Sequence, residues 1–391
     1  MKSHEIQIIK ELSWSNESEL PQKERTKHVH GIHPYLGKFV PQIVDYFLER
    51  HLKSARYILD PFVGSGTTLV ESNIHKINSL GIDISRFNVL LSTVKTDKYD
   101  MAILKHEIHD ITERVKLATK HYNKQTLESY FNQEEIKIEE PKSQYLKEWY
   151  LSKVLVPLLI FKSLIPKYKY QNTLKILLSR AARSSRLAPH YELDFPEKPQ
   201  REKYYCYKHS RTCYPTNDSL GFIIRYGKDI LQRIAEFQQL RTDAVTRAEW
   251  GDARVFDYAK YEIDGVITSP PYVGLIDYHK QHRYAYELLG LKDHSEKEIG
   301  PKSKGSSKKA IENYKTFMTK AFKKIANECL SNRATVVIIV NDKFNLYEDI
   351  MNEAGLGITA RYKRMVDRRT GRRANGFSED IIIWSTKNSY D

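Results

Sequence analysis

Two short apolar runs in the first quarter of the chain each end at an aspartate and predict buried strands. Residues 55–60 (ARYILD) end at Asp60, and residues 78–85 (NSLGIDIS) contain a second run that reaches Asp83. Apolar runs of this length, bounded by turn residues, are typical of buried parallel strands. A glycine-rich turn (61–68) and a helical pattern (69–77) lie between them. The order strand, turn, helix, strand predicts a nucleotide-binding βαβ unit.

The strand pattern returns only in the last third of the chain. Apolar runs over 264–269, 334–342, 357–366 and 380–386 predict further strands, with a helix over 346–354 and a flexible loop over 302–309 (KSKGSSKK). The stretch between is rich in Lys, Glu, Tyr and Leu, and we expect helices over 101–120, 145–165 and 222–240, with an irregular piece over 188–216. We therefore predict an α/β fold, with a Rossmann-like sheet built from 25–95 and 248–391 and an inserted, largely helical subdomain over 96–247.

The charge of the chain points to a polyanionic partner. Its 391 residues include 63 Lys and Arg against 49 Asp and Glu, a formal net charge of +14. Nucleic acid is the commonest partner of such a chain, although a merely basic protein fits the composition equally well. No apolar run is long enough to cross a bilayer, and the first residues lack the apolar core of a signal peptide. We expect a cytoplasmic protein without membrane contact.

Three cysteines, at 206, 213 and 329, are too few and too scattered for a disulfide framework. Cys206 and Cys213 lie in one segment with His209 between them, so a zinc site is conceivable. The spacing matches no standard ligand pattern, and no fourth ligand is evident. We expect free thiols and no metal ion.

The first candidate site is the turn DPFVGSGTT (60–68). Gly64 and Gly66 allow the backbone to turn tightly and to approach a ligand. The helix that follows offers free N–H groups at its start, and Asp83 at the end of the next strand is placed to accept hydrogen bonds from ribose hydroxyls. A phosphate-binding Walker loop would need a lysine where Thr67 stands. The alternative is a turn that only packs.

The second candidate site is TSPPY (268–272), which follows an apolar strand. Proline cannot continue strand pairing and holds the preceding residue extended, so Ser269-Pro270-Pro271 is a rigid exit from the strand. Its carbonyls are expected to lack competing local partners. Together with the Ser269 hydroxyl, these carbonyls could accept both hydrogens of an aryl amine and so make its nitrogen nucleophilic. Tyr272 could stack on the aromatic base that carries the amine. The alternative is a polyproline-type turn or a ligand for a proline-binding domain.

DPFVGSGTT and TSPPY together resemble the amino-methyltransferases that modify bases in DNA, as in bacterial restriction–modification systems. The resemblance implies a Rossmann-like S-adenosylmethionine-dependent methyltransferase sheet. It implies that residues 30–47 help to bind the methionine end of the cofactor, and that Asp252 of GDAR (251–254) lies near the adenine. The implied cofactor residues are His33, Tyr35, Lys38, Phe39, Asp60, Pro61, Phe62, Gly64, Gly66, Thr67, Thr68, Asp83 and Asp252.

The same resemblance implies a direct transfer of the methyl group to a base amine, with Ser269, Pro270, Pro271 and Tyr272 as the catalytic residues. The SPPY form is typical of cytosine-N4 enzymes, whereas adenine-N6 enzymes usually carry DPPY or NPPY. We therefore expect a site-specific cytosine-N4 methyltransferase acting on double-stranded DNA, with a cognate restriction endonuclease acting on the same site. The alternatives are adenine-N6 methylation of DNA, methylation of an RNA base, an inactive nucleic-acid-binding subunit and, least supported, a nucleotide hydrolase. The long insert between Asp83 and Asp252 departs from many relatives and leaves the location of target recognition open.

Three basic segments could face DNA. One carries Arg180, Arg183 and Arg186 at helical spacing, one (201–215) interleaves basic and aromatic residues around Lys208 and Arg211, and one pairs the 302–309 loop with a basic turn containing Arg369 and Arg372. The alternative for each is a solvated charged face. Residues 277–290 are expected to start a helix that walls the amine pocket. Its His279, His282 and Arg283 either touch substrate or lie on an ordinary helix surface.

Overall fold

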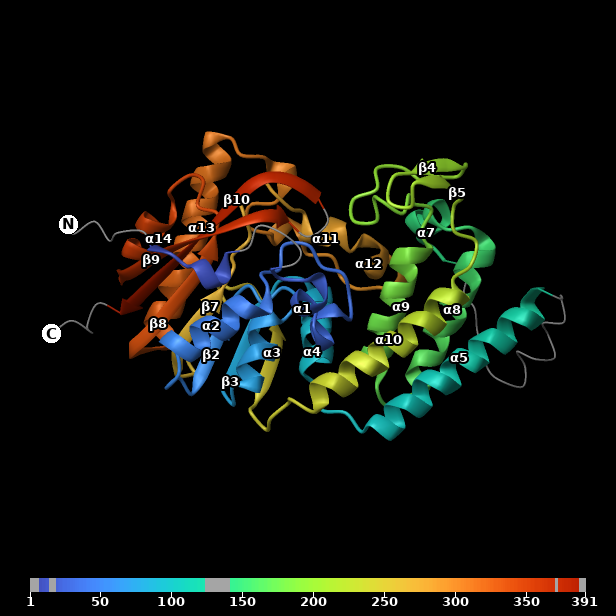
Figure 1. The fold of residues 1–391 in the computed structure, drawn as a ribbon, viewed down its shortest axis with the longest axis horizontal. Coiled ribbons are helices and arrows are strands. Elements are labelled where there is room, and N and C mark those ends of the chain that lie inside the picture. Colours follow the sequence, from blue (N-terminus) through green and yellow to red (C-terminus); the bar gives the residue numbers. More distant parts are fainter. Residues whose placement is uncertain (1–6, 14–18, 124–140, 370–371, 387–391) are drawn as a thin grey trace.

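The computed structural model describes residues 7–13, 19–123, 141–369 and 372–386. Figure 1 shows two parts side by side: a mixed sheet with flanking helices on one side, and a group of helices on the other. The first part contains both ends of the described chain, and the second is formed by its middle.

One sheet of eight strands forms the first part. Its order is β1, β9, β10, β8, β7, β2, β3, β6. All neighbours pair in parallel except β10, which is antiparallel to both β8 and β9. The bounds are β1 Gln7–Ile8, β2 Tyr57–Asp60, β3 Asn78–Asp83, β6 Thr246–Trp250, β7 Ile263–Thr268, β8 Leu330–Val340, β9 Leu356–Arg369 and β10 Arg372–Thr386. This is the Rossmann-like α/β sheet that the sequence predicts, extended at one edge by the β9–β10 hairpin.

Helices cover both faces of the sheet because alternate strand residues are apolar on each side. In β8, Val336 and Ile338 pack with α13 (Lys308–Glu328) and α14 (Tyr347–Glu353). Val337 and Ile339 point the other way and pack with α2 (Pro41–His51). The helices α3 (Thr67–Ile74) and α4 (Arg86–Thr96) follow β2 and β3.

The middle of the chain forms the helical part, as predicted. It contains α5 (Met101–Asn123), α7 (Gln144–Trp149), α8 (Ser152–Leu164), α9 (Gln171–Ser185), α10 (Leu220–Gln238) and a small hairpin of β4 (Tyr204–Cys206) and β5 (Arg211–Cys213). Its apolar core is shared with α4 and with α12 (Arg283–Leu289), so the two parts pack against each other through these helices.

Short elements complete the fold. They are α1 (Gln22–Arg25), α11 (Tyr278–Gln281) and the 3₁₀ turns Lys10–Leu12, His28–Gly31, Ile165–Lys167, Ser295–Lys297 and Lys302–Lys304. Only the first part of the loop predicted over 302–309 lies outside a long helix, because α13 begins at Lys308. Among the described residues, no helix is long and apolar enough to cross a membrane.

The strand order reverses between β2 and β7. From β2 the chain moves outward to β3 and β6, and it then returns to β7 and moves outward the other way to β8. Ligands of open α/β sheets bind in the crevice at such a switch point, beyond the carboxyl ends of the strands. Asp60 ends β2 and Thr268 ends β7, so both candidate motifs begin at this crevice.

Candidate active site

A cavity lies at the carboxyl ends of β2, β3 and β7, where ligands of open α/β sheets bind. It brings the two candidate motifs together, because residues of both line it. The sequence-predicted residues in its wall are Tyr35, Lys38, Phe39, Pro61, Phe62, Gly64, Thr67, Asp83, Asp252, Ser269 and Pro271.

The glycine-rich turn has the backbone conformation that its glycines suggest. Gly64 has φ of 49° and Gly66 has φ of 78°, in the left-handed region that other residues rarely adopt. A Cβ on Gly66 would lie 2.9 Å from the Ser92 hydroxyl, so the turn also lies tightly against α4. Lys95, fully buried on the same helix, donates to the Ser65 carbonyl at 2.6 Å. The side chains of α4 therefore fix the turn on one side, and the other side of the turn faces the cavity.

Asp60 lies behind the cavity wall and joins the two motifs. Its carboxylate accepts hydrogen bonds from Thr68 Oγ1 and Thr268 Oγ1, both at 2.7 Å, and from the Phe62 amide at 3.1 Å. Burial raises the pKa of this carboxyl to about 6, against the opposing effect of these hydrogen bonds. Asp60 and Thr68 thus position the site and do not line the cavity.

Asp83 lines the cavity, and its carboxylate also fixes the turn. One oxygen accepts from the Gly64 amide at 2.9 Å and the other from the Ser85 amide at 2.8 Å. Burial raises the pKa of Asp83 in spite of these bonds. The Asn88 side chain also bonds to Asp83. A carboxylate has about four acceptor positions, so about one remains for a ligand.

The segment before α2 forms another wall of the cavity. Tyr35 lies over Gly64 and accepts from Asn88 Nδ2 at 3.1 Å. Lys38 donates to the His30 carbonyl at 2.8 Å, and burial lowers its pKa to about 8. His33 does not line the cavity. It is buried behind the wall against Phe87, with Nδ1 at 2.8 Å from the Pro34 carbonyl, so the cofactor contact implied for it is replaced by a packing role.

Asp252 lies at the far side of the cavity in a two-point ion pair. Its oxygens accept from Arg254 Nε at 2.8 Å and Nη2 at 2.6 Å. Partial burial opposes ionisation, but the hydrogen bonds and charge of Arg254 hold the pKa of Asp252 below its usual range. Asp252 is therefore a fixed anion at the cavity.

The exit from β7 differs in two respects from the prediction. Ser269 and Pro271 line the cavity while Pro270 is buried, but the Pro271 carbonyl has a local partner: it accepts from Tyr314 Oη at 2.8 Å. Tyr272 lies in the wall of an adjacent cavity of about 880 Å³, together with Leu275, Phe344 and Tyr347 among others. The PPY segment therefore separates two cavities.

The structure adds cavity residues that the sequence does not reveal. Lys297, Glu298 and Ile299 reach the cavity from a polar loop that carries no motif. Glu298 is buried and accepts from the His279 amide at 2.8 Å and from the His279 ring. His279 and His282 are themselves buried, so neither is the helix-surface residue considered above.

Arg180 and Arg183 of α9 and Arg186, which follows it, do not form a DNA-facing row. Arg186 is 3% exposed and bonds to Tyr145 Oη and the Leu193 carbonyl, so its assignment to DNA is wrong. Arg180 and Arg183 form ion pairs with Asp229 and Asp194, and their side chains are only 13% and 11% exposed. A buried guanidinium costs free energy unless its N–H groups are paired, and here the partners of all three side chains lie within the helical part.

The other basic residues lie elsewhere. Lys208 and Arg211 are exposed on the β4–β5 hairpin. Arg369 and Arg372 face each other at the end of the β9–β10 ladder, and their side chains lie outside the described part of the structure.

Comparisons with known proteins agree with this geometry. A family profile described as DNA methylase matches residues 8–94. The type II methyltransferase M.MjaII of Methanocaldococcus jannaschii is 38% identical over 431 residues, which cover 93% of this chain and 81% of that protein. M.MvaI of Kocuria varians, also a type II methyltransferase, is 26% identical over 142 residues, covering 36% of this chain and 30% of its own.

Solved structures give a weaker likeness. TrmN from Thermus thermophilus aligns over 90% of this chain and 50% of its own with a TM-score of 0.34 and 9% identity. The rRNA methyltransferase aviRa from Streptomyces viridochromogenes aligns over 90% of this chain and 87% of its own with a TM-score of 0.32 and 10% identity.

The fold and the cavity define an S-adenosylmethionine-dependent methyltransferase. The chain belongs to the type II methyltransferases of the DNA methylase family. Its methyl donor is S-adenosylmethionine, and the cavity suits a ligand of that kind. A glycine turn leaves room for close backbone approach, Asp83 keeps an acceptor position, and apolar side chains such as Phe62 and Ile299 offer surface for an adenine ring.

Proposed function

We propose that this protein transfers a methyl group to the N4 amine of cytosine at a specific sequence in double-stranded DNA. The observation that carries the proposal is the shared cavity, in which Ser269 and Pro271 of the amine site lie in one wall with Gly64 and Asp83. Asp60 bonds to both strand exits and so fixes the distance between the donor and acceptor sites. Catalysis by positioning needs this kind of rigid juxtaposition.

The cofactor residues in this proposal follow from their places around the cavity. Gly64, Thr67 and the apolar pair Pro61 and Phe62 contact the cofactor, and Asp83 accepts from the ribose hydroxyls. Tyr35, Lys38 and Phe39 border the methionine end, and Asp252 borders the adenine. The shape of the turn depends on Gly66, Asp60 and Thr68, which do not contact the cofactor themselves. The buried His33 supports the wall of the cavity by packing.

The amine site works by polarisation. The Ser269 hydroxyl and a carbonyl of the following prolines accept the two amine hydrogens, which withdraws the nitrogen lone pair from the ring. When bound, S-adenosylmethionine would supply an electrophilic methyl group on its positively charged sulfur and would leave as S-adenosylhomocysteine. The methylated amine is acidic and releases its proton without a strong base. Tyr314, by bonding to the Pro271 carbonyl, fixes the direction in which that carbonyl points.

The target base must leave the duplex to reach this cavity. We expect Tyr272, in the wall of the adjacent cavity, to stack on a base that has been flipped out. The net charge of +14 supports a DNA duplex as the substrate. We include a cognate restriction endonuclease, acting on the same sequence, as the partner activity implied by the type II relatives.

Cytosine is favoured because Ser269 stands first in the SPPY motif, where adenine-N6 enzymes usually carry an acid or an amide. The test is to incubate the protein with unmethylated duplex DNA and S-adenosylmethionine, digest the DNA and identify methylated nucleosides by mass spectrometry. N4-methylcytosine is the expected product. N6-methyladenine would overturn the base assignment, and methylation of RNA but not DNA would overturn the substrate.

A further inference from the structure

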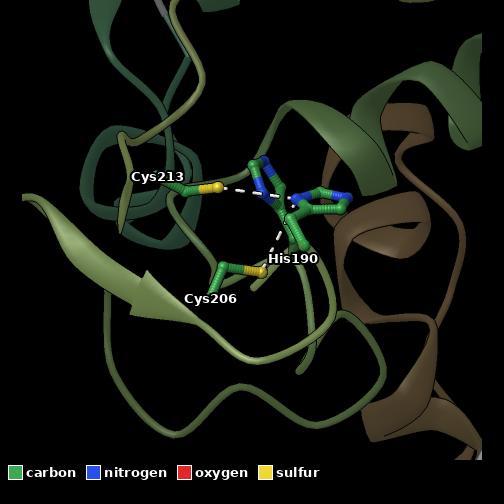
Figure 2. Close-up of side chains that lie close together, drawn as sticks. His190, Cys206 and Cys213 are labelled. Atoms are coloured by element: carbon green, nitrogen blue, oxygen red, sulfur yellow. Dashed lines mark hydrogen bonds between the residues drawn. The ribbon is translucent and has the colours of Figure 1, made fainter. Parts of the chain in front are cut away.

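Four side chains of the helical part gather at one point, away from the cavity. They are His190, Cys206, His209 and Cys213, and one ligand atom of each lies within 4.8 Å of the others. Figure 2 shows the side chains of His190, Cys206 and Cys213 directed toward a common centre. Neither thiol is in a disulfide, and both are buried. The spacing of Cys206, His209 and Cys213 suggests three of these ligands. The sequence does not indicate His190 as the fourth, because a long irregular loop separates it from Cys206.

The β4–β5 hairpin brings three of the four together. Cys206 ends β4, Cys213 ends β5, and His209 lies in the turn between them. The His209 amide donates to the Cys206 carbonyl at 3.1 Å, and Ser210 has φ of 50°, so the turn folds back over the two sulfurs. His190 enters from the loop after α9, where its amide donates to Tyr204 Oη at 3.0 Å.

Two distances from His209 to the sulfurs match those of a tetrahedral metal site. His209 Nδ1 lies 3.6 Å from Cys206 Sγ and 3.5 Å from Cys213 Sγ. Zinc–sulfur bonds of about 2.3 Å and zinc–nitrogen bonds of about 2.0–2.1 Å at the tetrahedral angle place sulfur and nitrogen about 3.5–3.6 Å apart.

Hydrogen bonding alone accounts poorly for the cluster. A neutral His209 has at most one proton on Nδ1, which cannot be shared well between two thiols. His190 Nδ1 is buried and has no hydrogen-bond partner within the described part of the chain. A cation at the centre satisfies both observations, since each of the four atoms then has a bond.

We propose that His190, Cys206, His209 and Cys213 bind one structural Zn²⁺ ion. Two thiolates and two imidazoles form a closed four-ligand set with no open position, which is the composition of structural and not of catalytic zinc sites. On binding, the two thiols release their protons to solvent and their sulfurs bond to the metal.

The surrounding segment has a physical need for such an ion. Between α9 and α10 the chain forms only the three-residue strands β4 and β5, and its large side chains Tyr191, Tyr205, Tyr207 and Tyr214 are exposed. So little apolar burial cannot fix the conformation of a segment this long, and small units of this kind are commonly held by a metal or a disulfide.

Two other groups of potential ligands are weaker candidates. His28, His30 and Glu71 are buried together, and Asp45, Glu49 and His75 lie on the surface. In each group a histidine already bonds to a carboxylate: His30 to Glu71 at 2.6 Å and His75 to Asp45 at 2.7 Å. Neither group contains a thiol. In the first group His28 and His30 Nδ1 have no hydrogen-bond partner within the described residues, but the group offers three side chains and not a closed set of four ligands.

The test is the zinc content of the full-length protein, purified without a histidine tag and measured by inductively coupled plasma mass spectrometry. We expect about one zinc per chain in the unaltered protein and in Cys329→Ser, whose thiol lies in the sheet core and bonds to the Ile325 carbonyl. Cys206→Ser, Cys213→Ser and His190→Ala should lose most of the metal. S-adenosylmethionine binding by calorimetry shows that each variant is folded around the cavity.

A second measurement keeps the proposal falsifiable if a variant does not fold. After chelation of the unaltered protein, Co²⁺ alone should restore a stoichiometric site with the visible absorption of tetrahedral cobalt and thiolate-to-metal charge-transfer bands. Absence of both zinc and the cobalt spectrum, or a Cys206–Cys213 disulfide found by peptide mass spectrometry in protein purified without added oxidant, would overturn it. The test uses no methylation assay, so its outcome is independent of the proposed base specificity.

Discussion

Asp60 is the side chain through which the two motifs of the active site meet. Its pKa of about 6 follows from burial, because three hydrogen bonds do not fully replace the lost water. The unfolded-state pKa is about 3.9. The folded protein therefore binds more protons than the unfolded chain between these values. The contribution of Asp60 to stability is fully present below about pH 4 and is lost as the pH rises through about 6.

We expect this effect to be visible in Asp60→Asn. The unfolding free energy of the unaltered protein minus that of the variant should fall by about 2–3 kcal/mol between pH 4 and pH 7.5, since one pKa unit corresponds to about 1.4 kcal/mol. Urea denaturation at a series of pH values measures it, with the exposed Asp257→Asn as the control. A difference that stays constant across this range would show that Asp60 keeps an ordinary pKa.

Ser269 tests the amine site. Ser269→Ala removes one of the two acceptors proposed for the amine hydrogens, and loss of one such polar group typically lowers the rate about 10²–10³-fold. Cofactor affinity, measured by calorimetry, should stay close to that of the unaltered protein, and Ser54→Ala at an exposed turn is the control. Full activity in Ser269→Ala would show that the amine is held elsewhere.

The sequence predicts only some of the polar residues that form the two sites. Gly64, Asp83 and Ser269 could be placed in the site because strand, turn and helix patterns fix where they lie. Arg186 and His33 could not, since their burial depends on packing between segments distant in the sequence. His190 and Glu298 belong to loops without a repeating pattern, so only the fold shows what they contact.

At the level of elements, the step from β2 to α3 depends on Gly66. It stands at the start of α3 with positive φ, and a Cβ there would also meet Ser92. Gly355 also has a positive φ, of 84°, but a Cβ added there would meet no other atom. An alanine at Gly355 therefore measures the free-energy cost of the left-handed backbone conformation alone, without a steric contact. The pair therefore isolates the packing of the turn against α4.

We expect Gly355→Ala to cost about 1–2 kcal/mol, the typical penalty of the left-handed conformation. Gly66→Ala should cost about 1–3 kcal/mol more, because the added carbon forces the turn away from α4. It should also weaken S-adenosylmethionine binding, which Gly355→Ala should not. Thermal denaturation and calorimetry give both values. Equal losses in the two variants would show that the turn has room to relax.

The elements themselves follow the sequence pattern closely, because alternating and continuous apolar runs report burial directly. The strands β2, β3, β7 and β8 and the helices α5 and α10 lie where their patterns predict. The pattern does not predict α13, because its amphipathic stripe begins inside the lysine-rich stretch that is typical of a loop. It also gave no order for the strands, which depends on pairing between distant segments.

For the molecule as a whole, the helical part connects the cavity to the zinc-binding segment. Tyr278 of α11 lines the cavity, and α12 follows and packs with α9, where Arg186 lies over the Tyr284 ring. The segment after α9 then carries the β4–β5 hairpin, at the end of the helical part in Figure 1. Its exposed Lys208 and Arg211, interleaved with exposed tyrosines, belong to the predicted DNA-facing set, as do the exposed lysines of the 302–309 loop.

We therefore expect Lys208→Ala and Arg211→Ala to weaken binding to duplex DNA. If each side chain contacts one phosphate, each change should reduce the slope of log affinity against log salt by about 1, because one fewer counterion is released on binding. Fluorescence anisotropy over a series of salt concentrations measures the slope. Lys53→Ala is the matched control, since Lys53 is exposed just before β2 at the amino end of the strands, opposite the cavity. Cofactor affinity and zinc content should not change in any of the three. Equal slopes for the hairpin variants and the control would place the DNA on another surface, and the zinc-held hairpin would then have a purely structural role.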